Sequence, residues 1–148
     1  MRWGWPPAAT TTLPEVSTSP AETEAAGERF GKRLRTGDLV LLVGELGAGK
    51  TTFVRGVARG TESDAPVASP TFQLVRVYPG RVQLAHVDLY RIEKASELAD
   101  LGLDELLDQG AVVVEWGDRL GTRKAALIEL EHLEGDRRLI RVKRDLRR

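Results

Sequence analysis

Two continuous apolar segments stand out in the pattern of hydrophobic and polar positions. Asp38–Val43 is apolar after its first residue, and Ala111–Val114 is apolar throughout. Short runs of this kind, rich in β-branched residues, are typical of strands buried on both faces of a sheet. Two further pairs of segments predict antiparallel hairpins: Phe72–Tyr78 with Arg81–Val87 across Pro79-Gly80, and Ala126–Leu130 with Leu139–Val142 across Glu134–Asp136.

Three segments carry the signals of helices. Ser19 to Glu22 form a capping box with Pro20 at the first helical position, so we expect a helix from Pro20 to about Arg35. Apolar residues recur at helical spacing after Lys50, as far as a stop at Gly60. Leucines in residues 96–108 follow a roughly helical pattern, which a glycine at position 102 divides into two short pieces.

The loop between the first apolar strand and the second helix matches the phosphate-binding pattern G-x-x-x-x-G-K-[ST] at every fixed position. It reads, in order, Gly44, Glu45, Leu46, Gly47, Ala48, Gly49, Lys50, Thr51 and Thr52. Its glycines allow the backbone N–H groups to approach phosphate oxygens. Lys50 supplies an ammonium for the β- and γ-phosphates, Thr51 a hydroxyl for Mg²⁺, and the helix its positive end. The motif therefore predicts nucleotide binding.

These elements predict an α/β fold, a three-layer P-loop NTPase-like domain. Its mixed sheet would have a parallel centre that holds the P-loop strand, with antiparallel hairpins added. We expect this domain to span residues 15–148. Residues 1–14, rich in Pro, Ala and Thr, are expected to form a loose leader.

Hydrolysis needs an acidic group at the end of a strand beside the P-loop. Asp88 follows Val82–Val87 and Glu115 follows the second apolar run, so both should lie at the carboxyl edge of the sheet. Which acid holds Mg²⁺ and which orients water stays open. Thr71, in the sequence Ser-Pro-Thr-Phe, is either a switch residue for Mg²⁺ or the γ-phosphate, or part of an ordinary loop-to-strand junction.

Other polar residues leave alternatives open. His86 is more typical of a structural or partner-facing histidine than of a metal ligand. Arg91 is either a cation for the transferring phosphate or a surface charge, and Trp116 either stacks on a base or partner or covers the edge of the core. The basic run from Arg137 to Arg148 is either a solvated edge strand with a charged tail or a contact for phosphate or RNA.

Composition narrows the classes of function. The 148 residues carry 22 Lys and Arg against 22 Asp and Glu, so no net charge favours a nucleic acid or a membrane. The sequence has no cysteine, which excludes disulfides and thiol catalysis and fits a cytoplasmic protein, and no apolar run reaches the ~18 residues of a membrane helix. It also has no asparagine, which excludes the Asn-Lys-x-Asp motif of GTPases and the catalytic-loop Asn of protein kinases.

The motifs together resemble one family, the small bacterial P-loop ATPases called TsaE (formerly YjeE). The resemblance covers about residues 15 to 143 and rests on the P-loop followed in order by Ser69-Pro70-Thr71-Phe72, His86-Val87-Asp88-Leu89-Tyr90-Arg91 and Val114-Glu115-Trp116. Many members continue after Glu-Trp with Pro and an acid, where this chain has Gly117, Asp118 and Arg119.

The resemblance implies a function. TsaE proteins bind and hydrolyse ATP with Mg²⁺ and support the TsaD–TsaB complex, which makes N6-threonylcarbamoyladenosine at position 37 of tRNAs reading codons that begin with A. The tRNA would be contacted only through that complex, and no membrane is involved. By motif position Thr51 and Glu115 would hold Mg²⁺, Asp88 would lie at the γ-phosphate, the metal or the attacking water, and Thr71 would lie in a switch loop. Ser19 and Trp116 would lie near the base.

Two other classes of function use the same P-loop. A small-molecule kinase would need a lid and an acceptor pocket, for which 148 residues leave little room. A nucleotide-binding module would bind ATP without hydrolysing it. Phosphate release, a phosphorylated acceptor or neither product distinguishes the three classes.

Overall fold

A computed structural model describes residues 15–45, 47–67, 75–89, 102–115 and 125–147. The expected leader and several residues of the sequence hypotheses lie outside these ranges, namely Leu46, Thr71, Arg91 and Trp116.

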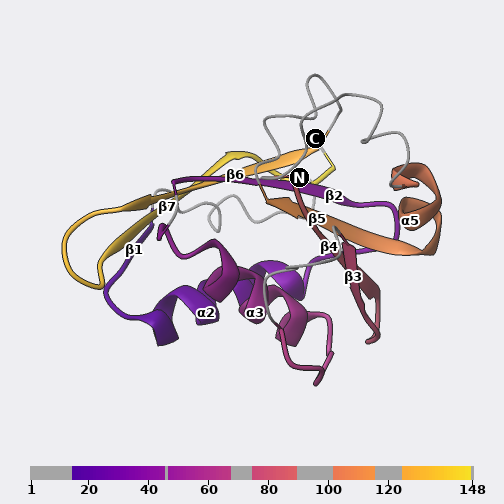
Figure 1. Cartoon of the computed structure of the whole chain (residues 1–148), viewed down its shortest axis with the longest axis horizontal. Helices are drawn as coiled ribbons and strands as arrows, with labels where there is room; N and C mark the ends of the chain where they lie inside the picture. Colours follow the sequence, from indigo (N-terminus) through magenta and orange to yellow (C-terminus); the bar gives the residue numbers. More distant parts are fainter. Residues whose placement is uncertain (1–14, 46, 68–74, 90–101, 116–124, 148) are drawn as a thin grey trace, which may run out of the picture.

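The described strands form one seven-stranded mixed sheet in the order β1-β7-β6-β2-β5-β4-β3 (Figure 1). The strands are β1 (Glu15–Ser17), β2 (Leu39–Val43), β3 (Val75–Tyr78), β4 (Gln83–Asp88), β5 (Gly110–Glu115), β6 (Ala126–His132) and β7 (Arg138–Arg144). β2 runs parallel to β5 and β6, and β4 runs parallel to β5. The pairs β3–β4, β6–β7 and β1–β7 are antiparallel. The predicted parallel centre with antiparallel hairpins is therefore confirmed.

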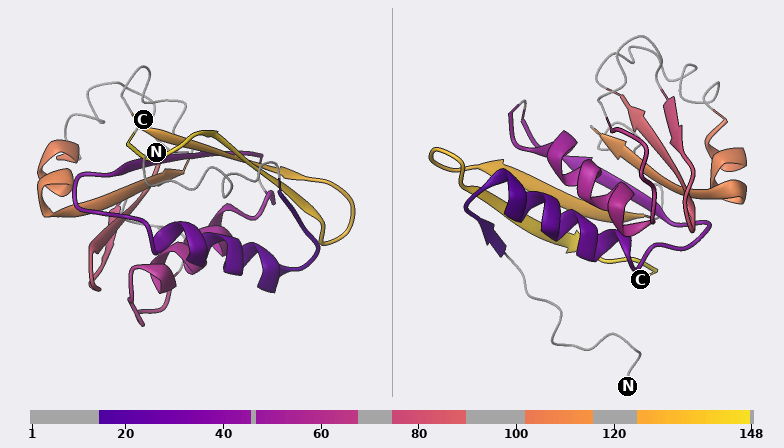
Figure 2. Two further views of the ribbon diagram at one scale, coloured as in Figure 1. Left: turned by 180° about the vertical axis from the view of Figure 1, so that it is seen from behind. Right: turned by 90° about the horizontal axis from the view of Figure 1, so that it is seen from below.

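Helices cover both faces of this sheet. α2 (Pro20–Gly31) and α3 (Lys50–Gly60) lie side by side across one face (Figure 2). Alternate residues of the central strands, such as Val40 and Val113, join the core beneath them. The intervening residues face the opposite side, where leucines of α5 (Leu103–Gln109) pack against a second apolar cluster. The described elements thus form three layers, as the apolar strand runs predict for strands buried on both faces.

The two helices of the first face touch through glycines. A Cβ on Gly27 would lie 2.1 Å from the carbonyl oxygen of Phe53, and one on Gly56 would lie 1.9 Å from that of Glu24. Gly31 and Gly60 lie one turn further along their helices, and a Cβ on either would also collide with the backbone of the other helix. We call these four residues the glycine seam. Because the contacts advance along both chains together, α2 and α3 run in the same direction and their amino ends lie on the same side of the domain.

Arg81, in the turn before β4, binds the carboxyl ends of both helices. Its guanidinium donates to the carbonyl oxygens of Gly31 and Leu34 at 3.1 Å and of Gly60 at 3.3 Å. The last carbonyls of a helix lack partners within the helix and carry its negative end, so a cation that donates to them is stabilising. α2 ends at Gly31 rather than near Arg35 as predicted, and the next residues form tighter turns in which the N–H of Arg33 bonds Phe30 and that of Leu34 bonds Gly31.

β7 corrects one prediction. It is not an edge strand, because β1, which we did not predict, pairs with it on the side away from β6. The residues after β7 pack back on the domain: Leu146 is buried, Asp145 accepts a hydrogen bond from Arg33 at 2.7 Å, and Arg147 pairs with Asp38. A three-residue strand such as β1 has too little alternation to be seen without its partner.

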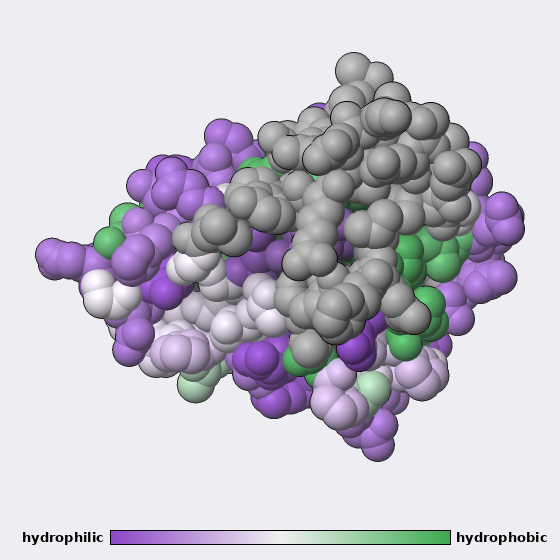
Figure 3. Space-filling view, viewed as in Figure 1, coloured by the Kyte–Doolittle hydropathy of each residue, from purple (hydrophilic) through white to green (hydrophobic). Residues whose placement is uncertain are grey.

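On the face seen in Figure 3 the described surface is mostly hydrophilic, with hydrophobic groups gathered on the side that carries α5 and β3. No helix within the described ranges is long and apolar enough to cross a membrane.

Candidate functional site

The P-loop connects the carboxyl end of β2 to the start of α3, as the motif requires. At its first position a Cβ would lie 2.5 Å from the carbonyl oxygen of Leu130, so only glycine allows the loop to pass this close to β6. Gly49, at the helix cap, has φ +97°, in the left-handed region that glycine tolerates best. Glu45 and Gly47 are exposed, whereas Ala48 is buried. The loop therefore has one side anchored on the sheet and one side open to a ligand.

Lys50, the first residue of α3, is only 5% exposed. Its Nζ donates to the carbonyl oxygens of Gly44 at 2.6 Å and Glu45 at 3.0 Å, so the ammonium lies across the loop. Burial lowers the pKa of Lys50 below its ordinary value, while the carboxylates of Glu115 and Asp88 act in the opposite direction. A buried cation at this position is suited to a phosphate.

The two predicted acids are neighbours at the carboxyl edge of the sheet. Asp88 is the last residue of β4 and Glu115 the last of β5, and they are partners in the parallel register. β2, which leads into the P-loop, pairs with β5 on the other side and places Leu42 opposite Glu115. The sequence prediction that both acids lie at the P-loop edge is confirmed.

Glu115 makes a contact that the sequence did not reveal. Its Oε2 lies 2.6 Å from Nε2 of His86, and both side chains are buried, at 4% and 0% exposed. Both also lie on the face of the sheet that α2 and α3 cover. His86 lies two residues after Leu84 and Glu115 two residues after Val113, and residues two apart in a strand face the same side. His86 is fully buried, so it does not face a partner, in agreement with the structural interpretation of this residue.

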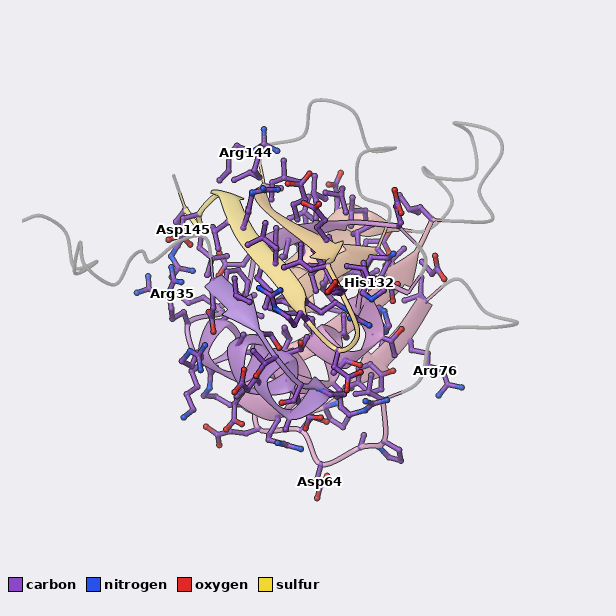
Figure 4. The ribbon with its side chains drawn as sticks, turned by 90° about the vertical axis from the view of Figure 1, so that its left-hand side faces the viewer. Arg35, Asp64, Arg76, His132, Arg144 and Asp145 are labelled. Atoms are coloured by element: carbon purple, nitrogen blue, oxygen red, sulfur yellow. The ribbon has the colours of Figure 1, made fainter. Side chains whose placement is uncertain are left out.

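Arg138, the first residue of β7, is a cation beside the P-loop that we did not single out. Its Nε lies 3.5 Å from the position that a Cβ on Gly49 would take. The guanidinium donates to the carbonyl oxygen of Gly135 at 3.0 Å, which His132 Nε2 also contacts at 2.9 Å. His132 lies near the end of the β6–β7 hairpin and Arg144 toward the other end of β7 (Figure 4).

The basic residues from Arg137 to Arg148 therefore have different surroundings in the structure. Arg138 lies at the P-loop, while Arg141 pairs with Glu129 at 3.0 Å and Glu131 at 3.3 Å. The only sequence signal for Arg138 was its membership of that run, because the spacing does not show which basic residue reaches the loop.

Ser19 caps α2 as predicted. Its Oγ accepts the N–H of Glu22 at 3.1 Å, and Glu22 Oε1 accepts the N–H and hydroxyl of Thr18 at 2.7 and 2.8 Å, which lowers the pKa of Glu22. β1 places Ser17 opposite Arg138, and the helices run in the same direction, so Ser19 lies on the P-loop side of the domain. Its contact with a base stays a prediction.

The oxygen donors near Lys50 fit a magnesium ion. Thr51 is the second residue of α3, and Asp88 and Glu115 lie together across the sheet edge. No group of three or more His, Cys, Asp or Glu in the described part of the chain could hold a metal by itself. Mg²⁺ keeps several waters and is commonly bound by one or two carboxylates with substrate phosphates, so a sparse donor set of this kind suits it.

Comparison with known proteins gives the family. The model of the family "Threonylcarbamoyl adenosine biosynthesis protein TsaE" matches residues 17–142. The chain belongs to the TsaE family. A TsaE protein of Mycobacterium tuberculosis is 42% identical over 124 residues, which cover 77% of this chain and 71% of that protein. The TsaE of Bacillus subtilis is 42% identical over 130 residues, covering 86% and 75%.

A solved structure supports the same assignment. The crystal structure of Bacillus subtilis YdiB superposes with a TM-score of 0.70 at 31% identity, and the match covers 86% of this chain and 82% of that one. This TsaE chain therefore has the P-loop NTPase-like α/β fold that the sequence predicts, and it is a member of a family of threonylcarbamoyladenosine biosynthesis proteins.

Proposed function

We propose that this TsaE protein binds and hydrolyses ATP with Mg²⁺. The observation that carries the proposal is the position of Lys50, buried across the P-loop and under the electrostatic influence of Glu115 and Asp88. P-loop enzymes combine a phosphate cradle with an acid that holds Mg²⁺ and a residue that orients the attacking water, and Asp88 and Glu115 are the candidates for these roles.

Each side chain has a separate role in this proposal. Lys50 would exchange its loop carbonyls for the β- and γ-phosphate oxygens, and Arg138 would add positive charge from the β6–β7 hairpin. Thr51 and Glu115 would hold Mg²⁺, which when bound neutralises phosphate charge during transfer. Asp88 would hold the metal or orient the attacking water, and Thr71 would complete the site from a switch loop.

The biological role proposed here is to support threonylcarbamoylation of tRNA. The family name places this chain in threonylcarbamoyladenosine biosynthesis. In this proposal the P-loop would supply a nucleotide cycle rather than the transfer itself. We propose that the cycle resets a cytoplasmic TsaD–TsaB complex that modifies adenosine 37 of tRNAs reading codons that begin with A.

We expect the isolated protein to hydrolyse ATP slowly and to be stimulated by TsaD–TsaB. A cation supplied or positioned on assembly contributes on the order of 10³-fold or more in related P-loop enzymes. The test measures phosphate release from ATP by the protein alone, with TsaD–TsaB, and with a P-loop variant as the control for contaminating ATPases.

The products separate the possible functions. Partner-stimulated phosphate release supports the proposal, whereas a phosphorylated acceptor would indicate a kinase. ATP binding without either product would indicate a binding module. Depletion of the protein in its cell should lower threonylcarbamoyladenosine in tRNA nucleosides measured by mass spectrometry. An unchanged level of threonylcarbamoyladenosine, in a cell with no second copy of the gene, would contradict the pathway role. It would not contradict the proposed ATP site.

A further inference from the structure

The side chains of His86 and Glu115 form a pair that is buried from solvent. An ionised carboxylate is costly to bury without a hydrogen-bond partner, and Glu115 is only 3% exposed. The imidazole Nε2 lies 2.6 Å from Glu115 Oε2, joining β4 to β5 between residues 29 apart in the sequence. No carboxylate in the described part of the chain other than Glu115 is both buried and paired with a histidine.

The geometry assigns the donor. A carboxylate oxygen only accepts, so the bond to Glu115 requires a hydrogen on Nε2 of His86. Within the described residues, Nδ1 of His86 is the one buried side-chain polar atom without a hydrogen-bond partner. Leaving one ring nitrogen without a partner costs less than burying an unpaired carboxylate, so the bond to Glu115 is the contact that the site preserves.

The imidazole is also fixed in place. The ring is fully buried and its centroid lies 6.3 Å from that of Tyr78 on the neighbouring strand. His86, Asp88 and Glu115 all lie on the face of the sheet that supports α3 and the P-loop, and the pair uses one of the two oxygens of Glu115. A ring enclosed on this face by the core favours one orientation of that carboxylate.

We propose that His86 is a positioning residue for the divalent cation of the ATP site. Its imidazole donates Nε2–H to one oxygen of Glu115 and directs the second oxygen of that side chain to the metal. Partners of this kind orient metal ligands in other proteins, and losing one typically costs about 10–100-fold in metal affinity or activity. The proposal rests on the proposed function, because it takes Glu115 as a ligand of the metal that accompanies ATP.

The experiment compares two substitutions. His86→Gln places an amide N–H near the position of Nε2, whereas His86→Leu keeps a bulky apolar side chain and removes the donor. For each, ATP affinity is measured by calorimetry across a range of Mg²⁺ concentrations and also without the metal. His86→Leu should raise the Mg²⁺ concentration for half-maximal effect by ~10–100-fold while leaving metal-free ATP affinity unchanged. His86→Gln should need far less additional Mg²⁺ than His86→Leu because it retains the donor.

A second measurement needs no variant. Long-range proton–nitrogen NMR spectra of the wild type should show a hydrogen on Nε2 of His86. This readout, together with His86→Gln, decides the proposal if His86→Leu does not fold. An Nε2 without a hydrogen would overturn it.

Other results separate this inference from the proposed function. An unchanged Mg²⁺ requirement in His86→Leu, or equal defects in both variants, would leave His86 as a core residue only. In that case wild-type ATP binding would still require Mg²⁺ and the proposed function would stand. A wild-type protein that binds no ATP at any Mg²⁺ concentration would instead overturn the proposed function itself.

Discussion

The glycine seam gives a prediction in which helix propensity and packing oppose each other. Gly27 lies inside α2, where replacing glycine by alanine favours the helix by about 1 kcal/mol. A Cβ at this position would lie 2.1 Å from the carbonyl oxygen of Phe53 in α3 and 3.1 Å from the amide nitrogen of Val57. Since ordinary contact begins near 3.4 Å, the two helix backbones would have to separate by about 1.3 Å at this point.

The packing cost should exceed the gain in propensity. Adding a methyl to a well-packed core costs typically ~1–3 kcal/mol, occasionally more, and a backbone carbonyl cannot turn aside as a flexible side chain can. With a packing cost at the upper end of that range, about 3 kcal/mol, and a propensity gain of about 1 kcal/mol, Gly27→Ala should lower the free energy of unfolding by about 2 kcal/mol. For a domain of this size that corresponds to a fall of about 4–8 °C in Tm.

Urea denaturation followed by circular dichroism measures this change, with an unchanged m-value showing that the unfolding transition remains comparable. The matched control is Ala25→Gly, at an exposed position in the same helix. It should also destabilise, by about 1 kcal/mol, because only propensity acts there. Opposite substitutions two residues apart would then both lower stability. Equal or higher stability of Gly27→Ala would show that the helices are not in backbone contact, and the glycine seam would be refuted.

Three further predictions concern the site and its support. Lys50→Ala should weaken ATP binding by ~10–100-fold in calorimetry, because the phosphate loses a buried charged donor. The control Arg55→Ala, on the exposed side of α3, should bind ATP with the affinity of the wild type. Glu115→Gln and Asp88→Asn should retain far more ATP affinity than Lys50→Ala yet lose ~10²-fold or more in phosphate release; normal turnover by both would remove the catalytic assignment. Arg81→Ala should lower the free energy of unfolding in urea by about 1–3 kcal/mol, because carbonyls at the helix ends lose their hydrogen-bond donor. The control Arg76→Ala, at an exposed position of β3, should lower it by under ~0.5 kcal/mol. Equal stability of the two arginine variants would contradict the role given to Arg81.

Much of this site could be predicted from the sequence because its signals are local. The path from β2 through the P-loop to α3 follows from one apolar run, one motif and one helical pattern. Asp88 and Glu115 could be placed because an acid directly after a buried strand must lie at the end of that strand. Parallel pairing of β4 with β5 then brings the two acids together.

Other features depend on pairings between distant segments. β1 is too short to be predicted from its own residues, and it is a strand because it pairs with β7. The same pairing shows that β7 is not an edge strand. Arg138 reaches the P-loop only because the β6–β7 hairpin folds beside it, and nothing in the basic run distinguished it from Arg141.

The nucleotide motif, the order of most elements and the acids at the strand ends could be derived from local sequence, since each depends on residues within one turn or one strand. The bond between His86 and Glu115 and the glycine seam between α2 and α3 become visible only in the folded chain. The role of a buried histidine depends on the group that it contacts, and a glycine within a helix is required only where another backbone lies in the place of its side chain.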